Sequence, residues 1–233
     1  MDIKRFAAAA LGAASVLLTA ASPGGSASLE AEVLARINAA RQHPRDYAEQ
    51  LRDYRRHFEG RIVYLPGDRN GVITNEGIAA VDEAIDFLEH QAPLPPLDPG
   101  ALLALAAQDH ADAQGDLGAT GHVSAAGASP GDRVRARGGD IYVGEGISYG
   151  FDDADAVVRQ LIVDDGVRGR GHRTLVFDTA FRFAGVGCGG HRRFRHMCVI
   201  DFAGTVDGGP VLPEWARARG GRIVRKPTVV AGR

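Results

Sequence analysis

The chain has 233 residues, of which 45% are hydrophobic and 24% are charged, so it is long enough for one sizeable domain with a buried core. Its formal net charge of -2 argues against a global attraction to nucleic acid or to acidic membranes. We therefore expect no nucleic-acid partner.

The N-terminus has the pattern of a secretory signal peptide. Lys4 and Arg5 precede an uncharged, Ala- and Leu-rich run over residues 6–21. That run is too short and too weakly apolar for a secure membrane span, although an uncleaved anchor is the alternative. Small residues follow, so we predict a signal peptide over residues 1–27, cleaved after Ala27, with Ala21 as a second position. No later segment could span a bilayer. This predicts a secreted or periplasmic protein and does not separate the two.

Helical spacing dominates the first half of the chain. Apolar residues predict a helix over residues 29–58, interrupted near His43 because Pro44 cannot continue it. A turn-rich loop over 65–77 leads to a second helix over 79–91. An extended proline-rich connector follows, and the pair Asp98-Pro99 predicts the start of a third helix.

The second half combines glycine-rich sequence with strand-like runs. We expect loops up to Gly150, a helix over 152–165 with N-capping aspartates, and two strands in "FAGVGCGG" and "HMCVIDFAG". Helices first and antiparallel strands last indicate a mixed α and β domain in layers. The remainder, residues 207–233, is predicted to be a poorly packed basic tail.

Two cysteines, Cys188 and Cys198, flank the loop between the predicted strands. They are placed roughly opposite one another, and in an exported protein we expect them to be oxidised to a disulfide worth about 2–3 kcal/mol. Two buried free thiols are the alternative if the protein is not exported.

Four places carry titratable side chains next to small residues, namely His122, Glu145, the pair Asp164-Asp165, and His172. Two imidazoles and one or two carboxylates could hold a divalent metal such as zinc, or could work as acid–base pairs. Each alone is a weak signal, since a histidine beside glycine is usually an ordinary loop residue.

Six stretches in order then resemble a known family, the bacterial branch of the CAP superfamily (cysteine-rich secretory, antigen 5 and pathogenesis-related class 1 proteins), also called SCP-like extracellular domains. They are "INAARQHPRDYAEQL", "LPPLDPGALLALAAQDHADAQ", "GATGHVS", "VGEGISYG", "LIVDDGVRGRGHRTLVFD" and "GVGCGGHRRFRHMCVIDFAG". The resemblance implies an α+β fold, a three-layer α-β-α sandwich with a mainly antiparallel sheet, here over residues 28–206.

The same resemblance implies a cavity lined by two histidines and two acids, which in many members binds a divalent cation, often zinc. By motif these are His122, Glu145, His172 and, with Asp165 close behind, Asp164. Two departures stand out. The family asparagine after the glutamate is Gly146 here, which puts the rigidity of that segment in doubt, and an aspartate replaces the second glutamate.

Three functions remain open. The first is an exported, monomeric binding domain for a small ligand, a lipid or an extracellular partner, with or without a cation in the cavity. The second is a metal-assisted or histidine-based hydrolase of protease type, which we favour less because Ser124 and Ser148 are nucleophile candidates only by proximity. The third is a polyanion-binding protein with an arginine-rich rim made of Arg168, Arg170, Arg173, Arg192, Arg193 and Arg195.

Other polar residues have simpler interpretations. His110 is expected to pack within a helix or to be half-exposed, whereas His191 and His196 are expected to be exposed beside the hairpin loop. Arg133 could pair with a carboxylate near the cavity, and Arg173 could pair inward.

Overall fold

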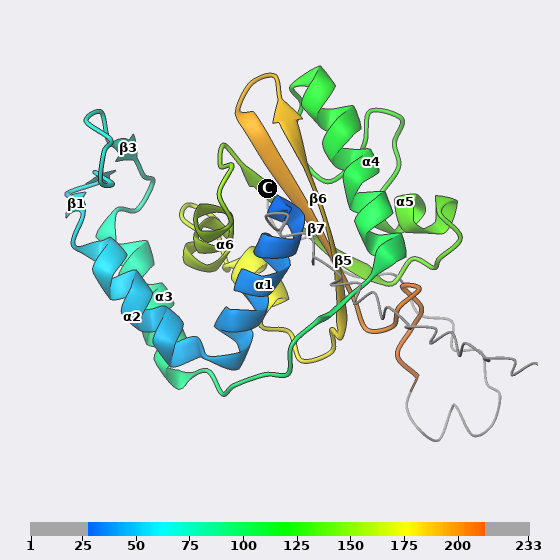
Figure 1. Ribbon diagram of the computed structural model, residues 1–233, viewed down its shortest axis with the longest axis horizontal. Helices are drawn as coiled ribbons and strands as arrows, with labels where there is room; N and C mark the ends of the chain where they lie inside the picture. The colour runs from blue at the N-terminus through cyan, green and yellow to red at the C-terminus, as the bar shows by residue number, and fades with distance from the viewer. Residues whose placement is uncertain (1–27, 213–233) are drawn as a thin grey trace, which may run out of the picture.

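The computed structural model describes residues 28–212, which form seven helices and seven strands (Figure 1). The helices are α1 Leu29–Gln42, α2 Pro44–Arg55, α3 Ile78–His90, α4 Ala101–Leu117, α5 Pro130–Ala136, α6 Ala154–Val163 and α7 Gly171–Val176. The strands are β1 Phe58–Glu59, β2 Ile62–Val63, β3 Val72–Ile73, β4 Asp98–Pro99, β5 Val143–Tyr149, β6 Phe183–His191 and β7 Arg195–Ala203.

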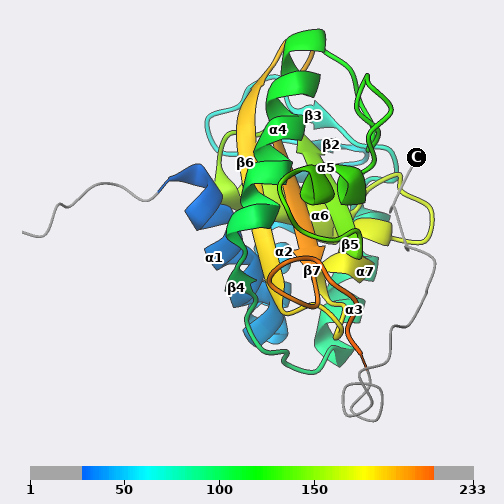
Figure 2. The same ribbon diagram turned by 90° about the vertical axis from the view of Figure 1, so that its right-hand side faces the viewer.

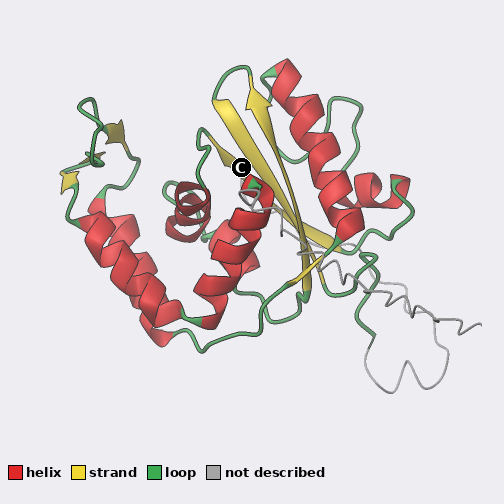
Figure 3. Ribbon diagram, in the orientation of Figure 1, coloured by secondary structure: helices red, strands yellow, loops and turns green. Residues whose placement is uncertain are grey.

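The central sheet has four strands in the order β4-β6-β7-β5 (Figure 3). Strands β6 and β7 form an antiparallel hairpin, β5 pairs antiparallel with β7, and the short β4 runs parallel to β6. The β5–β7 register places Glu145 opposite Asp201. The sheet is therefore mainly antiparallel, as the family resemblance implies.

Helices cover both faces of this sheet. Helix α4 packs across β6 and β7 on one face with α5 beside it, while α1 and α6 lie on the other face (Figure 2). The largest apolar core lies under α1, α2, α3 and α6, and smaller clusters lie under α4. The predicted three-layer α+β sandwich is thereby confirmed.

Two glycines let α4 approach β6 closely. A Cβ added to Gly185 would lie 2.0 Å from the backbone nitrogen of Ala104, and one added to Gly187 would lie 2.3 Å from that of Gln108. Neither space can hold a methyl group, so any side chain at these positions would push the helix off the sheet.

The break near His43 is confirmed, because α1 ends at Gln42 and Pro44 opens α2. The predicted helix start at Asp98 is wrong. Asp98 and Pro99 form β4, since the Asp98 and Gly100 amides donate to the carbonyls of Arg182 and Ala184 in the sheet. Pairing with β6 therefore overrides the local preference of proline for a first helical turn, and α4 begins at Ala101.

The predicted glycine-rich loop up to Gly150 is also wrong in part, because it contains α5 and β5. Helix α5 begins with a capping box in which the side chains of Ser129 and Asp132 satisfy each other's backbone amides. Strand β5 forms because β7 supplies a full ladder of partners. Gly144 and Gly146, which weaken any local strand signal, are tolerated in that ladder.

An inserted arm stands beside the sandwich. Residues 58–77, which we call the arm, hold the small sheet β1-β2-β3 at the far end of the α2–α3 helix pair (Figure 1). Its base is fastened to the α6–α7 loop, because the Asp165 carboxylate accepts the amides of Asn75 and Glu76 at 2.6 and 2.8 Å.

The hairpin carries the predicted disulfide between Cys188 and Cys198, which face each other in the β6–β7 register. The expectation that His191 is exposed is wrong. It is 3% exposed, because its ring packs against Tyr149 and Phe194 and its Nε2 lies 2.7 Å from the carbonyl oxygen of Ala119. His196, by contrast, is half-exposed.

The predicted signal peptide lies outside the described residues, as does most of the predicted tail. At the start of that tail, Asp207 and Gly208 accept hydrogen bonds from the amides of Asp140 and Tyr142. Between residues 28 and 212, none of the helices is long and apolar enough to cross a bilayer.

Replacing Gly187 with alanine should lower the free energy of unfolding by about 1–3 kcal/mol, because the methyl group overpacks the α4–β6 contact. Gly189 lies on the same face of β6, but its added Cβ would find its nearest neighbour at 3.8 Å. Alanine at Gly189 should change stability by less than about 0.5 kcal/mol. Urea denaturation of both variants measures the difference, and equal effects would contradict the close helix approach.

Candidate functional site

The first half of the site is a buried histidine–carboxylate pair. His122 lies in the loop after α4, and its Nδ1 is 2.8 Å from Oε1 of Glu145, in the middle of β5. Glu145 is fully buried and His122 is nearly so. A carboxylate on Nδ1 fixes the orientation of the ring, and His122 also lines the groove described below.

Arg133 on α5 completes this half. Its guanidinium pairs with the second oxygen of Glu145 and also donates to the carbonyl of His122 at 3.0 Å and to that of Ala128 at 3.1 Å. The expected pairing of Arg133 with a cavity carboxylate is thus confirmed. A buried carboxylate is costly without a partner. Removing Arg133 alone would leave the charge of Glu145 without its cation and lower the free energy of unfolding by about 3–5 kcal/mol, as in comparable pairs.

A further acid, Asp201, sits against Glu145 and was missed from the sequence. It lies on β7 opposite Glu145, is fully buried, and neither carboxyl oxygen has a hydrogen-bond donor among the described residues. Burial, and then the charge of Glu145, raise the pKa of Asp201 well above its usual value. The protonated Asp201 can donate its O–H to Glu145. The only sequence signal was an aspartate within the apolar run "VIDFA".

The loop that carries His122 is fastened to α4 and β5 through Gly121. The Gly121 amide donates to Tyr149 Oη at 3.0 Å, and the Gly121 carbonyl accepts Gln114 Nε2 at 2.6 Å. His110, which is fully buried, reaches the same carbonyl at 2.9 Å. These contacts hold His122 in place through its backbone. Burial lowers the pKa of His110, which favours the neutral ring.

The second half of the site lies at the end of α6. The Nδ1 of His172 is 2.6 Å from Oδ1 of Asp164, and the amides of His172 and Arg173 lie 2.9 and 3.3 Å from Oδ2. Asp164 ends α6 in the left-handed conformation, with φ of 56°, which turns its side chain toward the start of α7. Asp164 is therefore the partner of His172, while Asp165 binds the arm.

Two arginines of the predicted rim are used inside the fold. Arg173 is buried and donates to the carbonyls of Ile162 and Val163 at 2.6 and 3.0 Å, as expected for an arginine that pairs inward. Arg170 binds Glu76 and Glu83. Arg170 and Arg173 are therefore not available to the predicted arginine-rich rim. They instead join α6 and α7 to α3 and the arm.

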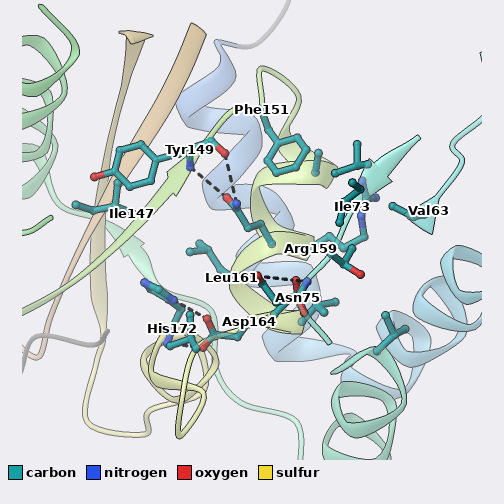
Figure 4. Close-up of a pocket in the computed structure, with 18 of the residues that line it drawn as sticks. Val63, Ile73, Asn75, Ile147, Tyr149, Phe151, Arg159, Leu161, Asp164 and His172 are labelled. Atoms are coloured by element: carbon teal, nitrogen blue, oxygen red, sulfur yellow. Dashed lines mark hydrogen bonds and ion pairs between the residues drawn. The ribbon is translucent and has the colours of Figure 1, made fainter. Parts of the chain in front are cut away.

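Both histidines line one groove with a volume of about 950 Å³. Its walls are the loop at residues 120–123, β5, α6 and the arm, and most of its lining is apolar, including Val63, Ile73, Ile147, Phe151 and Leu161. Figure 4 shows His172 and Asp164 together on one side of the groove and Ile73 across from Leu161. The volume is at the upper end of the range for small-molecule sites.

Of the four predicted site residues, only His122 and His172 are placed to bind a metal ion directly. Within residues 28–212, no three side chains among His, Cys, Asp and Glu are arranged to hold a metal. Glu145 and Asp164 each bind Nδ1 of a histidine, so they act behind the rings rather than beside a shared ion. Carboxylates in this position orient metal-binding histidines and raise their basicity.

The nucleophile candidates are engaged elsewhere. Ser124 Oγ lies 3.2 Å from Arg133 Nη1 and 3.3 Å from His110 Nδ1, and Ser148 Oγ donates to Gln160 at 2.6 Å. Neither serine lines the groove.

The fold described above is that of a CAP domain. The sequence profile of the cysteine-rich secretory protein family, CAP, matches residues 34–202, and the chain belongs to that family.

Among solved structures, an extracellular protein containing an SCP domain from Bacillus anthracis str. Ames is similar at 23% identity with a TM-score of 0.40. The match covers 51% of this chain and 36% of that one, so this chain spans about a third of its length. No curated protein matches the chain.

Gly146, which stands where the family has an asparagine, occupies a defined position in the structure. Gly146 lies within β5 and pairs with Ile200, so this segment is held by the sheet. A Cβ at this position would lie 3.6 Å from Cδ2 of His172. A methyl group would therefore fit at this position in ordinary contact with His172, whereas a longer side chain would extend into the space between the two halves of the site.

Replacing Asp201 with asparagine should remove a pH dependence of stability. The raised pKa of Asp201 means that its protonated form stabilises the fold fully below about pH 4 and that this contribution is lost as the pH rises through the folded pKa. Asparagine cannot ionise, so the variant should gain stability relative to the parent between about pH 4 and pH 8, by about 1.4 kcal/mol for each unit of pKa shift.

Urea denaturation across that pH range measures this change. Asp116→Asn, at an exposed position, controls for the loss of one negative charge. A constant difference between Asp201→Asn and the parent would show that Asp201 is ionised in the fold.

Proposed function

We propose that this protein is an exported, monomeric binding domain that holds a small, largely apolar ligand in the groove between the arm and the CAP sandwich. The observation that carries the proposal is the groove itself, in which a mainly apolar lining surrounds His122, His172 and Asp164. Export is supported by the signal-like N-terminus and by the disulfide, which persists in oxidising compartments.

Binding fits the geometry better than hydrolysis does. A hydrolase needs a nucleophile or an activated water beside a base. Here the two serines nearest the histidine–acid pairs donate to or accept from other side chains, and the acids are engaged by the histidines. The groove thus offers shape and apolar contact, with fixed polar groups that orient a ligand.

A divalent cation at the two histidines is a second candidate. It is favoured by one observation, the carboxylate on Nδ1 of each ring, which is typical of histidines that bind zinc. The cation would take its protein ligands from His122 and His172, and Glu145 and Asp164 would support the rings. Bound there, it would supply a Lewis-acidic contact for a polar group of the ligand.

A polyanion-binding surface is less well supported. Arg170 and Arg173 are paired within the fold, and Arg193 lies over the Phe194 ring at the opposite, hairpin end of the sheet. The predicted rim is thus divided between two separate parts of the domain.

Replacing Ile73 with asparagine should weaken the binding of the neutral, apolar fluorophore Nile red by roughly tenfold, because Ile73 projects into the groove and would lose apolar contact with the probe. Fluorescence titration of the purified full chain measures the affinity. Leu117 is also exposed but lies away from the groove, so Leu117→Asn should leave the affinity unchanged. Equal affinity of the parent and Ile73→Asn, or no binding by the parent, would overturn the proposal.

Replacing His122 and His172 together with alanine should abolish zinc binding, which isothermal titration calorimetry can measure. The fold should persist because Arg133 still neutralises Glu145 and backbone amides still bind Asp164. His90→Ala, at an exposed position, is the matched control. Zinc affinity that survives in the double variant would place the ion elsewhere, and no binding by the parent would exclude the cation.

A further inference from the structure

The edge strand of the central sheet, β5, forms part of the groove wall. It is the last strand in the order β4-β6-β7-β5, so only one of its two sides is paired with another strand. Ile147 and Tyr149 of β5 line the groove together with Gln160 and Leu161 of α6. Figure 4 shows Ile147 and Tyr149 on the strand, with Leu161 on the helix beside it. An unpaired strand edge is a template for pairing with another chain.

The register with β7 determines which main-chain groups of β5 point to its unpaired side. The Gly150 amide donates to the carbonyl of His196 at 2.9 Å. Hydrogen-bonded and non-hydrogen-bonded pairs alternate along an antiparallel ladder. Ser148 therefore bonds to β7, while Tyr149 and Ile147 turn their N–H and C=O groups away from it.

A glutamine side chain already occupies the position at Tyr149. Oε1 of Gln160 accepts the Tyr149 amide at 3.1 Å, and Nε2 of Gln160 donates to the Tyr149 carbonyl at 3.3 Å (Figure 4). One side-chain amide thus bonds to both main-chain groups, as the backbone of a neighbouring strand would.

The position at Ile147, two residues along the same side, has no such partner. Between residues 28 and 212, no group hydrogen-bonds to the N–H or C=O of Ile147 outside the sheet. Ile147 is only 6% exposed, and main-chain groups at such depth are nearly always paired. The backbone amide of a bound ligand can supply the missing donor and acceptor.

The two histidines lie on opposite faces of this edge. Side chains alternate across a strand, and Glu145 points to His122 on the face that also carries Ile147. Gly146 points to the other face, where an added Cβ would lie 3.6 Å from the His172 ring. A strand added to β5 would therefore run between the two imidazoles, and Gly146 places no side chain in its way.

The charged groups that line the groove do not favour a ligand of one sign. Arg159 on α6 is positive and Asp165 is negative, and both line the groove. Asp164 is held by His172. A lining with both signs among apolar side chains complements a neutral main chain, which carries both donors and acceptors, better than it complements an anion or a cation.

We propose that the groove binds an extended, uncharged peptide segment, which adds as a strand to β5 and exchanges main-chain hydrogen bonds with Ile147 between the two histidines. This inference rests on the proposed binding function and adds the chemical class of the ligand, its orientation and the contact that selects it. In strand addition, main-chain bonds supply affinity and alternate side chains fill apolar surface. A ligand without amides would leave the Ile147 groups unpaired.

Two peptides test the proposal: acetyl-Thr-Val-Thr-Val-Thr-amide and the same peptide with every internal amide N-methylated. Methylation removes the N–H donors and blocks close approach of a strand, but it keeps the apolar side chains. Calorimetry with the full chain should show that the unmodified peptide binds at least about tenfold more tightly, because the main-chain hydrogen bonds are lost with the methylated one.

Hydrogen exchange followed by NMR tests the contact without a mutation. Saturating unmodified peptide should slow exchange of the Ile147 amide by at least about tenfold, since the amide gains a partner. The Ser148 amide, which is paired with β7 in both states, is the internal control and should not change. Peptide binding without protection of Ile147 would overturn strand addition at this position.

Ile147→Pro removes the outward N–H and leaves the β7 ladder intact, as proline does on an edge strand. It should weaken the unmodified peptide by about tenfold and leave the methylated peptide unaffected. Ile147→Val shortens the same side chain but keeps the N–H, so it should retain the preference for the unmodified peptide. The exchange measurement on the parent protein decides the matter if the proline variant does not fold.

The outcomes separate this inference from the binding function. If Nile red binds but the unmodified peptide does not, or if both peptides bind equally, strand addition fails and the binding function stands. If neither Nile red nor the peptides bind, both proposals fail.

Discussion

The buried charge of Glu145 is the constraint on which the rest of the site depends. A carboxylate in the middle of a sheet cannot remain ionised without close partners, and Arg133, His122 and Asp201 meet it from three directions. Arg133 brings α5 against β5, and His122 brings the loop after α4. One electrostatic requirement thereby joins the helical layer to the sheet and places the first imidazole at the edge of the groove.

The imidazole of His172 is positioned by the C-terminal end of α6. Asp164 stops α6 in a left-handed turn and binds both the ring and the amide of His172. The next residue, Asp165, turns the other way and binds the arm. Two consecutive aspartates thus connect His172 to the arm, which forms another wall of the groove.

The binding function that we propose agrees with the way in which the polar groups of the groove are already hydrogen-bonded. Asp164 and Asp165 in its lining already accept hydrogen bonds, and Arg159 is stacked on the ring of Tyr54. Groups satisfied in this way have little freedom to transfer protons, but they keep their orientation when a ligand enters. The same arrangement that makes the site rigid makes its shape and charge the features that would select a ligand.

Local sequence determined the elements whose signals lie within a few residues. The helix break at Pro44, the N-cap at Asp153, the β6–β7 hairpin and its disulfide follow from proline, capping and alternating patterns. Motif resemblance predicted His122, Glu145, Asp164 and His172 as site residues. Tertiary structure decided what depends on distant partners. Asp98-Pro99 became a strand because β6 lies beside it, and β5 formed because β7 supplies its ladder. Asp201 acquired its role, and Arg159 its place over Tyr54, only when residues far apart in the chain came together, and no local pattern records such contacts.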